Sequence, residues 1–392
     1  MLMTQDKFLP YAKQSIDDSD IAEVTSALKQ ELITRGKKTQ NFEAALAERL
    51  GAKWAVTFTS ATTALYAAAQ AADISSFDRY ITTPNSFIAT AASGMRLGAR
   101  LHFVDIEKKN GNINAELVKK ALAEPLSRGR HIIVPVHFSG NAVDMKEIDR
   151  AIKSPNTIVI EDAAHAIGSK YPSGELVGSC PYSHMTVFSF HAIKTLTTAE
   201  GGAVTTNDDM LYQRLQKIRN SGMERSQSHL QLGKEAPWYY EVQEIAANYH
   251  MSEMQAALGL SQLKRLDSFI EKRAQVAAWY RTHLQNLPNI LQLDISADAR
   301  STYHLMVLLF DFEKMKKSRT EVMQALKAKG IGTQYHYIPL YRHPALQKQY
   351  GHFQELCPEM ESYYKQALSI PFYADLEESD VKFVCRTLKE LL

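Results

Sequence analysis

The chain has 392 residues, of which 45% are hydrophobic and 22% are charged, and these fractions are typical of a globular protein and argue against a disordered or fibrous one. Its 45 basic and 43 acidic residues leave a formal charge of +2, which excludes a strong general attraction to nucleic acid or to anionic membranes. The length exceeds what one hydrophobic core usually organises, so we expect two domains, or one large domain with an appendage.

The cysteines and the N-terminal segment indicate a cytosolic protein. Cys180, Cys357 and Cys385 are scattered without a metal-ligand spacing, and three isolated cysteines do not make a disulfide framework. The first residues lack a basic region followed by a long apolar stretch, and no window approaches about eighteen uninterrupted apolar residues. We therefore expect a reducing compartment and no membrane segment.

Short β-rich runs alternate with helical stretches in the first half of the chain. The predicted strands cover residues 54–58, 80–84, 100–105, 131–138, 157–162, 185–190 and 201–206, and helices are predicted at 61–72 and 115–124. Strands interleaved with helices in this way are typical of an α/β fold with a mostly parallel sheet. The sequence therefore predicts a large domain built on a mostly parallel sheet of seven strands.

A different pattern begins near residue 210. Residues 251–284 predict one long helix, and a strand at 304–310, a helix at 318–330 and an amphipathic C-terminal helix follow. The polar stretch 226–238 contains Gly and Pro and predicts a loop that is mobile or folded over a site. We expect residues 1–250 to form the large domain with an N-terminal substrate segment, and residues 251–392 to form a linking helix and a small α+β domain.

Two of the predicted strands end in residues suited to cofactor chemistry. The apolar run 157–162 ends in Glu161 and Asp162, at the carboxyl edge of a buried parallel strand, where ligands bind in open α/β sheets. A carboxylate there can pair with the protonated ring nitrogen of pyridoxal 5′-phosphate (PLP) and keep that ring an effective electron sink. The run 185–190 leads to Lys194 on a turn, from which the lysine can point at the same edge.

Each of these residues alone has an ordinary explanation. A lone lysine after a strand is usually solvated, and a lone aspartate at a strand end usually caps a helix. Asp162 and Lys194 each at a strand end, with Ser189 and His191 beside the lysine, form a specific constellation. Their conjunction indicates a PLP site.

The start of the helix at 61–72 is a candidate phosphate site. A strand leads directly into Ser60, Ala61 and Thr62, and the free N–H groups and positive dipole end of a helix start favour an anion. A simple Ser or Thr N-cap is the alternative. Phe87 follows another strand and could stack on a planar ring, although an isolated aromatic residue is more often part of the core.

These segments carry a resemblance to a known family. SATTAL, TPNSFIATA, EDAAHAIGS, FSFHAIK, TTAEGGAV and NYHMSEMQAALGLSQL resemble, in order and spacing, the sugar-nucleotide aminotransferases of the DegT/DnrJ family, over nearly the whole chain. The resemblance implies fold type I of the PLP-dependent transferases and a homodimer. Within the family it is strongest to members of pseudaminic acid synthesis, which implies amino transfer, with L-glutamate as donor, to C4 of a UDP-linked 2-acetamido-2,6-dideoxy-4-hexulose.

The resemblance also implies catalytic roles. Lys194 would hold PLP as a Schiff base and shuttle the proton. Asp162 would pair with the pyridine nitrogen, and His165 would lie by the ring and its O3′. Phe87 would stack on the ring.

Further binding positions follow from the same resemblance. The cofactor phosphate would be surrounded by Ala61, Thr62 and Ser189. Asn248, which the sequence places at the start of a helix, would reach in from the partner subunit. The substrate positions that match are Tyr11, Glu31, Leu32, Ile33, Thr34, Ala61, Ser189, Asn248, Thr333, Gln334, Tyr335 and His336.

Two comparisons with the family's pattern bear on function. Many relatives carry Arg two residues after the asparagine, where this chain has His250, and a histidine supplies less certain positive charge to a diphosphate. Some members replace the lysine with histidine and are dehydratases, but this chain retains Lys194.

Alternative functions stay open at this point. An amino-acid aminotransferase and a sugar aminotransferase acting at C3 are the nearer ones. A PLP-binding regulator is the farther one, and it would be expected to carry a DNA-binding helix-turn-helix. No metal is expected, and the single Gly-x-Gly at 330–332 follows a helix and is weak evidence for a dinucleotide.

Overall fold

The central sheet of the large domain has seven strands in the order β1-β7-β6-β5-β4-β2-β3. The computed structural model describes residues 8–232, 236–285, 287–294, 301–351 and 356–392. The strands are β1 Trp54–Phe58, β2 Arg79–Thr82, β3 Arg100–Phe103, β4 His131–Val134, β5 Ile158–Asp162, β6 Met185–Ser189 and β7 Gly202–Thr206. The pairs β3-β2, β2-β4, β4-β5 and β5-β6 are parallel, whereas β7 runs antiparallel to both β1 and β6. The predicted mostly parallel sheet of seven strands is confirmed.

Proline sets the end of two strands that the sequence predicted to be longer. β2 ends at Thr82, shortly before Pro84, and β4 ends at Val134, next to Pro135. Proline has no N–H to give to a strand ladder and restricts the residue before it, so the predicted runs 80–84 and 131–138 stop early. After β4 the chain turns through a 3₁₀ helix at Phe138–Gly140.

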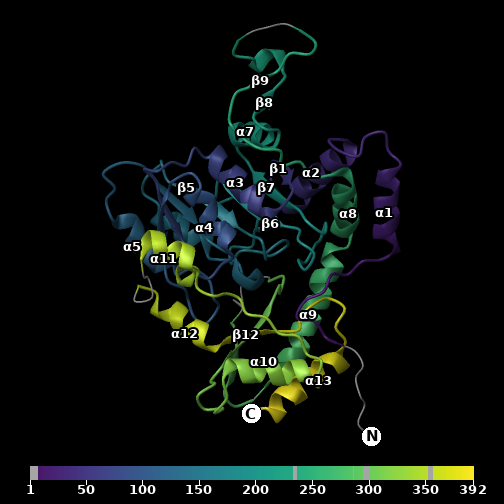
Figure 1. Cartoon of the computed structure of the whole chain (residues 1–392), viewed down its shortest axis with the longest axis vertical. Helices are drawn as coiled ribbons and strands as arrows, with labels where there is room; N and C mark the ends of the chain where they lie inside the picture. Colours follow the sequence, from purple (N-terminus) through teal and green to yellow (C-terminus); the bar gives the residue numbers. More distant parts are fainter. Residues whose placement is uncertain (1–7, 233–235, 286, 295–300, 352–355) are drawn as a thin grey trace.

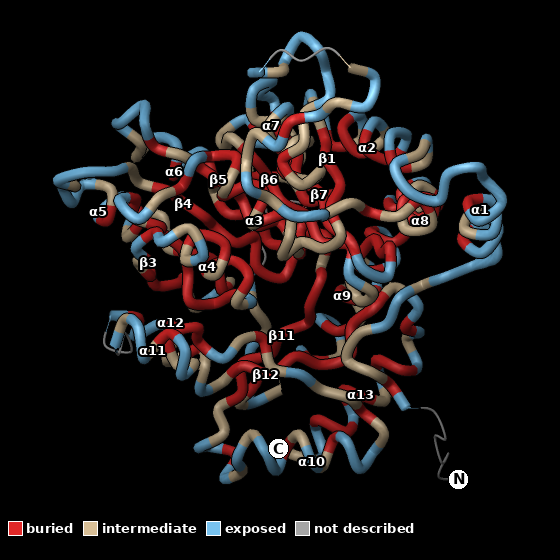
Figure 2. The backbone as a smooth tube through the Cα atoms, turned by 45° about the horizontal axis from the view of Figure 1, so that its top comes forward, coloured by how far each residue is buried: buried red, intermediate tan, exposed pale blue. Residues whose placement is uncertain are grey.

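Helices cover both faces of this sheet, and alternate residues of each strand face opposite layers. In β5, Ile160 packs with one layer and Val159 with the other. The first layer is formed by α3 Ala61–Ala71, α4 Ile88–Met95 and α7 Asp209–Arg219, and the second by α2 Lys37–Leu50, α5 Ala115–Ala123, α6 Met145–Ala151 and α8 Glu253–Lys264. Figure 2 shows the strands buried between these layers. Because both faces are covered, most residues of the central strands are buried.

The C-terminal part has its own antiparallel sheet and core. Its strands are β10 Ile290–Gln292, β11 Met306–Phe310 and β12 Ala367–Ile370, in the order β10-β11-β12. The helices α9 Leu266–His283, α10 Arg319–Ala328 and α13 Glu378–Glu390 pack on it, and α11 Pro344–Tyr350 and α12 Pro358–Gln366 lie beside the large sheet (Figure 1). Within the described ranges, no helix is both long and apolar enough to cross a membrane.

The helix predicted over 251–284 is in fact two helices. α8 ends and α9 begins at Arg265, whose backbone angles of φ −100° and ψ 2° are not helical. The Arg265 guanidinium is paired with Asp17 and Asp20, at the start of α1 Asp18–Leu28, and these contacts hold the chain at the break. α8 packs on α1 and α2, and α9 packs on α13. The division into residues 1–250 and 251–392 stays a prediction.

The segment between α7 and α8 forms an arm that projects from the body (Figure 1). We define the arm as residues 223–245; it contains the short antiparallel strands β8 Met223–Glu224 and β9 Glu241–Val242. The predicted loop 226–238 lies at its tip, and its residues 233–235 are outside the described ranges. Apolar side chains on the arm face solvent, with Trp238 75% and Ile245 87% exposed.

α8 and α2 are in close contact at Gly259 and Phe42. A Cβ added at Gly259 would lie 2.5 Å from the ring of Phe42, which is fully buried and packs on Phe190 with ring centroids 5.5 Å apart. Gly259→Ala should destabilise the fold by about 1–3 kcal/mol, because overpacking outweighs the gain of about 1 kcal/mol in helix propensity. Urea unfolding checks this, with the exposed Lys264→Ala of the same helix as control. Equal or higher stability of Gly259→Ala would contradict the packing argument.

Candidate active site at the carboxyl edge of β5 and β6

A cavity of about 380 Å³ lies at the carboxyl ends of β5 and β6. Its walls come from the N-terminal segment, the starts of α3 and α4, the turns after β5 and β6, and the segment between α10 and the 3₁₀ helix Leu340–Arg342 in the C-terminal part. The predicted site residues that line it are Tyr11, Ala61, Thr62, Phe87, Asp162, His165, Ser189, Lys194 and His336. Side chains far apart in the sequence are therefore brought together as the carboxyl edge of a parallel sheet predicts.

Asp162 is the last residue of β5, and its side chain is buried at 4% exposure. Its Oδ2 accepts a hydrogen bond from Thr90 Oγ1 at 2.6 Å, and its Oδ1 accepts one from the N–H of Ala164 at 3.1 Å. Burial raises the pKa of Asp162, although these hydrogen bonds and the charge of Lys194 oppose the rise. A buried carboxylate bonded to neutral groups is a suitable partner for the protonated nitrogen of a pyridine ring.

Lys194 lies on the turn after β6, where its backbone N–H donates to the carbonyl of His191 at 2.9 Å. Burial lowers the pKa of Lys194 to about 8, and the charge of Asp162 opposes that fall. An amine with such a pKa is neutral in a substantial fraction of molecules near neutral pH. It can therefore act both as a nucleophile and as a base.

Three buried histidines surround Lys194. The rings of His165 and His304 lie 4.3 Å apart between centroids, and the Nε2 of His304 is 3.4 Å from Lys194 Nζ. Burial, followed by the charge of Lys194, lowers the pKa of His165 and of His304 well below the usual value and that of His336 to about 3. All three imidazoles are neutral at neutral pH, so they can position groups without adding charge.

The tautomer of His165 follows from its neighbours. Its Nδ1 accepts the N–H of Ser139 at 3.3 Å, so the ring proton is on Nε2. That Nε2 is 3.3 Å from the hydroxyl of Tyr337. His165 can thus donate a hydrogen bond to a ring oxygen in the cavity.

The start of α3 provides an anion-binding corner. Ser60 caps this helix by accepting the N–H of Thr63 at 3.2 Å. The first N–H groups of a helix have no acceptor within it, and Ala61 and Thr62 at this position line the cavity. The strand β7 passes close by, since a Cβ added at Gly202 would lie 2.6 Å from the backbone nitrogen of Ala61. The corner suits a phosphate group, and together with Asp162 and Lys194 the cavity fits PLP.

The other predicted residues lie outside this cavity. Residues 31–34 are exposed, and the carbonyl of Ile33 accepts the N–H of Glu253 at 3.1 Å while Thr34 pairs with Ser252. Asn248 is also exposed and pairs with Asn220 in an isolated bridge. On one chain, some of the predicted site residues therefore line the cavity and others lie on the surface. We define the surface group as residues 31–34 and Asn248.

The prediction that Asn248 starts a helix is wrong. α8 begins at Glu253, and Ser252 is its N-cap, with its hydroxyl accepting the N–H of Gln255 at 3.3 Å and the Gln255 side chain accepting the N–H of Ser252 at 2.9 Å. This capping box places the N-cap four residues after Asn248 and the first helical residue five residues after it. The residues before it are extended, and Tyr249 exchanges backbone hydrogen bonds with Thr59 and Arg219.

Thr333, Gln334 and Tyr335 lead up to His336 without lining the cavity. Gln334 pairs with Ser369 beside β12, and the Tyr335 hydroxyl donates to the carbonyl of Tyr364 at 3.1 Å. These contacts hold the segment so that His336 and Tyr337 face the cavity.

His250 is half-buried, and its Nε2 lies 3.0 Å from Asn220 Oδ1. Burial, with added repulsion from Arg219 and Arg35, lowers the pKa of His250 to about 4. The ring is neutral at neutral pH and offers no positive charge to a diphosphate. The departure from the family's arginine is thus a loss of charge at this position.

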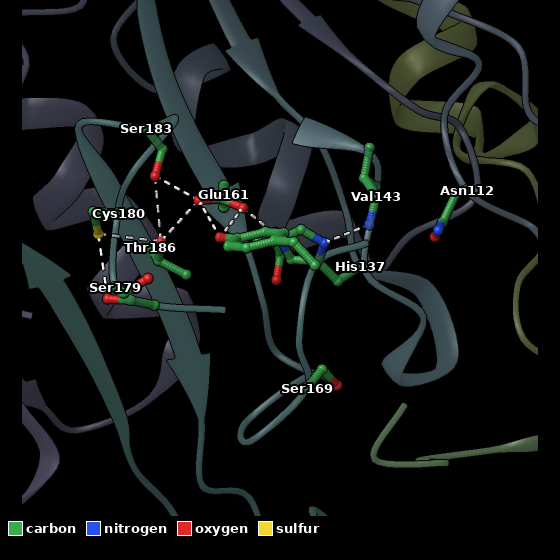
Figure 3. A network of polar contacts seen from close by, with 12 residues as sticks. Asn112, His137, Val143, Glu161, Ser169, Ser179, Cys180, Ser183 and Thr186 are labelled. Atoms are coloured by element: carbon green, nitrogen blue, oxygen red, sulfur yellow. Dashed lines mark hydrogen bonds and ion pairs between the residues drawn. The ribbon is translucent and has the colours of Figure 1, made fainter. Parts of the chain in front are cut away.

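A second polar network lies on the other side of β5. Figure 3 shows Glu161 beside His137, Ser183 and Thr186. Glu161 is fully buried and accepts hydrogen bonds from His137 Nε2 at 2.7 Å, from the Tyr171 hydroxyl at 2.8 Å and from the hydroxyls of Ser183 and Thr186. Burial alone would raise the pKa of Glu161, but the bonds from His137, Ser183 and Tyr171 bring it below the usual value. The N–H of His137 also donates to the carbonyl of Asp162 at 3.1 Å, so this network fixes the end of β5.

Several site residues were missed from the sequence. They are Ser86, Thr90, His304 and Tyr337. Thr90 lies within the segment TPNSFIATA, so its position was visible but its contact with Asp162 was not. His304 lies within an apolar run and gave no signal. Within the described ranges, no group of three His, Cys, Asp or Glu side chains is arranged to hold a metal ion.

Comparison with known proteins agrees with this geometry. The model of the DegT/DnrJ/EryC1/StrS aminotransferase family matches residues 14–389. The chain is 36% identical to the spore coat polysaccharide biosynthesis protein SpsC of Bacillus subtilis, covering 100% of this chain and 99% of that protein. It is also 36% identical to a UDP-4-amino-4,6-dideoxy-N-acetyl-beta-L-altrosamine transaminase of Campylobacter jejuni, covering 98% and 97% of the two chains.

Solved structures are similar over the same length. The Helicobacter pylori aminotransferase PseC, described as involved in pseudaminic acid biosynthesis, superimposes with a TM-score of 0.88 at 30% identity, covering 98% of this chain and 99% of that one. The Streptococcus pneumoniae sugar aminotransferase Spr1654 in its PMP form gives a TM-score of 0.88 at 25% identity over 98% of both chains, and its PLP form is also known.

The family match confirms the sequence-based prediction of an aminotransferase of PLP fold type I with PLP as cofactor. The match spans both the large sheet and the C-terminal part, as the resemblance implied. This chain belongs to the DegT/DnrJ/EryC1/StrS aminotransferase family.

Proposed function

We propose that this enzyme transfers an amino group from L-glutamate to C4 of a UDP-linked 2-acetamido-2,6-dideoxy-4-hexulose, a precursor step of pseudaminic acid. The observation that carries the aminotransferase chemistry is the pair formed by Asp162 at the end of β5 and Lys194 on the turn after the adjacent strand β6, which line one cavity. The sugar and its C4 ketone are supported by similarity to the Campylobacter jejuni transaminase and to PseC.

The residues of the cavity would hold PLP by separate contacts. Asp162 would bind the ring nitrogen, and the N–H groups of Ala61 and Thr62 with the hydroxyl of Ser189 would bind the phosphate. Phe87 lies at the mouth of the cavity and would cover one face of the ring. His165 would donate a hydrogen bond from Nε2 to the phenolic oxygen O3′ on the PLP ring. When bound, PLP supplies the electron sink that stabilises a carbanion.

Lys194 would perform the proton transfers. With a pKa of about 8, its neutral amine can take a proton from Cα of the amino donor. In the second half of the reaction the same Nζ would deliver a proton to C4 of the sugar. The neutral state of His165, His304 and His336 keeps further positive charge away from this amine.

The substrate would enter between the N-terminal segment and the segment that follows α10, which carries His336. Tyr11 and His336 line that side of the cavity with ring centroids 5.6 Å apart. A hydroxyl and a neutral imidazole at this place can bind hydroxyl groups of a sugar.

The active unit is proposed to be a homodimer in the cytoplasm. The surface group cannot reach the cavity of its own chain as a lining element, but a partner chain could bring its own surface group to that cavity. The exposed apolar side chains of the arm, including Trp238 and Ile245, support such an interface. Cys180, Cys357 and Cys385 are free and buried, which fits a reducing compartment.

The runner-up is an aminotransferase for another nucleotide sugar. SpsC is as identical to this chain as the Campylobacter jejuni enzyme is, and its description names spore coat polysaccharide biosynthesis. A ketone at C3, or the opposite configuration at C4, would use the same cofactor residues. The difference would lie in the walls around Tyr11 and His336.

The substrate assignment predicts a specific product. Purified holoenzyme, incubated with L-glutamate and UDP-linked 4-keto-6-deoxy-N-acetylhexosamine epimers, should convert the altrosamine precursor at least about tenfold faster than a 3-keto sugar nucleotide, since one misplaced group typically costs that much. Mass spectrometry and NMR of the product measure this. Preference for the 3-keto sugar, or no conversion of any of the 4-keto sugars, would overturn the assignment.

The cofactor assignment predicts the site of a covalent label. Borohydride reduction of the PLP-bound protein should fix the cofactor on Lys194, because only the lysine bound to PLP becomes locked by reduction. Peptide mapping by mass spectrometry finds the labelled residue. Lys194→Ala should lose turnover and keep its fold by circular dichroism, while Lys119→Ala on exposed α5 serves as the control. A label on another lysine would contradict the role of Lys194.

The dimer assignment predicts complementation between two inactive chains. Lys194→Ala and Asn248→Asp should each be nearly inactive as homodimers. In the mixed dimer one site keeps both Lys194 and the partner's Asn248, so activity should return to about one good site per dimer. Asn156→Asp, a change at another exposed asparagine, is the matched control and should keep full activity as a homodimer. If heterodimers form and no activity returns, Asn248 acts in cis or outside the site.

A further inference from the structure

His304 touches the atom of Lys194 that the proposed chemistry uses. It lies just before β11, in the C-terminal part of the chain, and its side chain is buried at 2% exposure. Its Nε2 is 3.4 Å from Lys194 Nζ, within reach of a hydrogen bond that tightens when the site is filled. The sequence gave no signal for this contact, and the family resemblance assigned it no role.

Among the residues that the structure describes, the His304 ring makes its polar contact with Lys194 Nζ. Its Nδ1 is buried and has no hydrogen-bond partner among the residues that the structure describes. One face of the ring packs on His165, with centroids 4.3 Å apart and planes at 37°. Buried ring nitrogens normally have hydrogen-bond partners. Because Nε2 contacts the Lys194 amine while Nδ1 stays unpaired, the position of this ring favours the contact with the amine.

The backbone of His304 is held from two sides. Its N–H donates to the carbonyl of Ser139 at 2.9 Å. Arg273 of α9 donates from Nη1 to the carbonyls of Tyr303 at 3.2 Å and His304 at 3.4 Å. Arg273 is only 2% exposed, and burial lowers its pKa to about 10, so it stays charged at neutral pH. Burial of the Arg273 cation costs free energy. Its hydrogen bonds to the two carbonyls fix this segment.

We propose that His304 is a positioning residue of the proposed aminotransferase, whose Nε2 accepts a hydrogen bond from the ε-ammonium of Lys194 whenever that nitrogen is not bound to PLP. The contact aims Nζ while it holds the transferred proton. This inference rests on the proposed role of Lys194, but the contact itself is measurable without turnover.

The charges around Lys194 give the sign of the effect. The titratable groups that face it are Asp162 from β5 and the histidines 165, 304 and 336, of which the histidines are neutral. Arg273 also faces His304. A hydrogen bond to the charged ammonium is stronger than one to the neutral amine, so loss of the acceptor favours the neutral amine. Without His304 the pKa of Lys194 should fall below about 8.

Two amide variants separate this role from packing. The amide of glutamine reaches the position of Nε2, whereas the shorter amide of asparagine reaches only that of Nδ1. His304→Gln should therefore keep the contact with Lys194, and His304→Asn should lose it. Both variants are polar and smaller than histidine, so a purely structural role would affect them alike.

The test measures the pH dependence of Lys194 labelling by an amine-reactive reagent in full-length protein. The protein is loaded with pyridoxamine 5′-phosphate, which leaves Nζ free, and mass spectrometry reads the Lys194 peptide. The midpoint should fall by about one pH unit in His304→Asn and stay within a few tenths in His304→Gln, as expected for one charge-assisted hydrogen bond. The exposed Lys119 is the internal control, and His102→Asn in the edge strand β3 is the variant control.

The outcomes divide clearly. An unchanged midpoint in His304→Asn, or equal shifts in the asparagine and glutamine variants, would overturn the proposal. The same labelling without any cofactor added must give the same order of midpoints, since the contact needs only the chain. If borohydride fixes PLP on another lysine while the midpoint order holds, the contact stands and the positioning role fails.

Discussion

The burial of two opposite charges at one sheet edge is the constraint on which the site depends. Asp162 ends β5 and Lys194 lies on the turn after the neighbouring strand β6. Removal from water shifts each toward its neutral form: the pKa of Asp162 rises and that of Lys194 falls to about 8. Their mutual attraction opposes both shifts without cancelling them. The cavity thus has a carboxylate ready for a cationic ring and an amine ready to accept a proton, both near neutral pH.

Such a pair needs a rigid frame, and the frame is built on both sides of β5. Because side chains alternate along a strand, Asp162 faces the cavity while Glu161 faces the opposite layer. Glu161 has its acceptor sites filled by His137, Tyr171, Ser183 and Thr186, so its charge is fully hydrogen-bonded (Figure 3). His137 then ties this network to the carbonyl of Asp162. On the cavity side the hydroxyl of Thr90 fixes the Asp162 carboxylate itself.

The sequence predicts what depends on local pattern and misses what depends on packing between distant segments. Apolar runs and the residues after them located Asp162 and Lys194 at strand ends, and the order of strands and helices predicted the sheet. The break at Arg265 was hidden because a continuous helical pattern crosses it, and the ion pairs with Asp17 and Asp20 that hold it are distant in sequence. His304 was hidden for the same reason, since only the fold brings an apolar run of the C-terminal part to Lys194.

The division of the site between cavity and surface has a physical consequence. Phe87 lines the cavity and yet is 58% exposed, so the mouth is open to water on a single chain. Proton transfer at a stabilised carbanion is favoured when water is excluded, and a second chain is the nearest means of covering the mouth. The surface group is exposed, and so are apolar side chains of the arm such as Trp238 and Ile245. A dimer that places them over the partner's cavity would bury the exposed apolar side chains and close the site in one step.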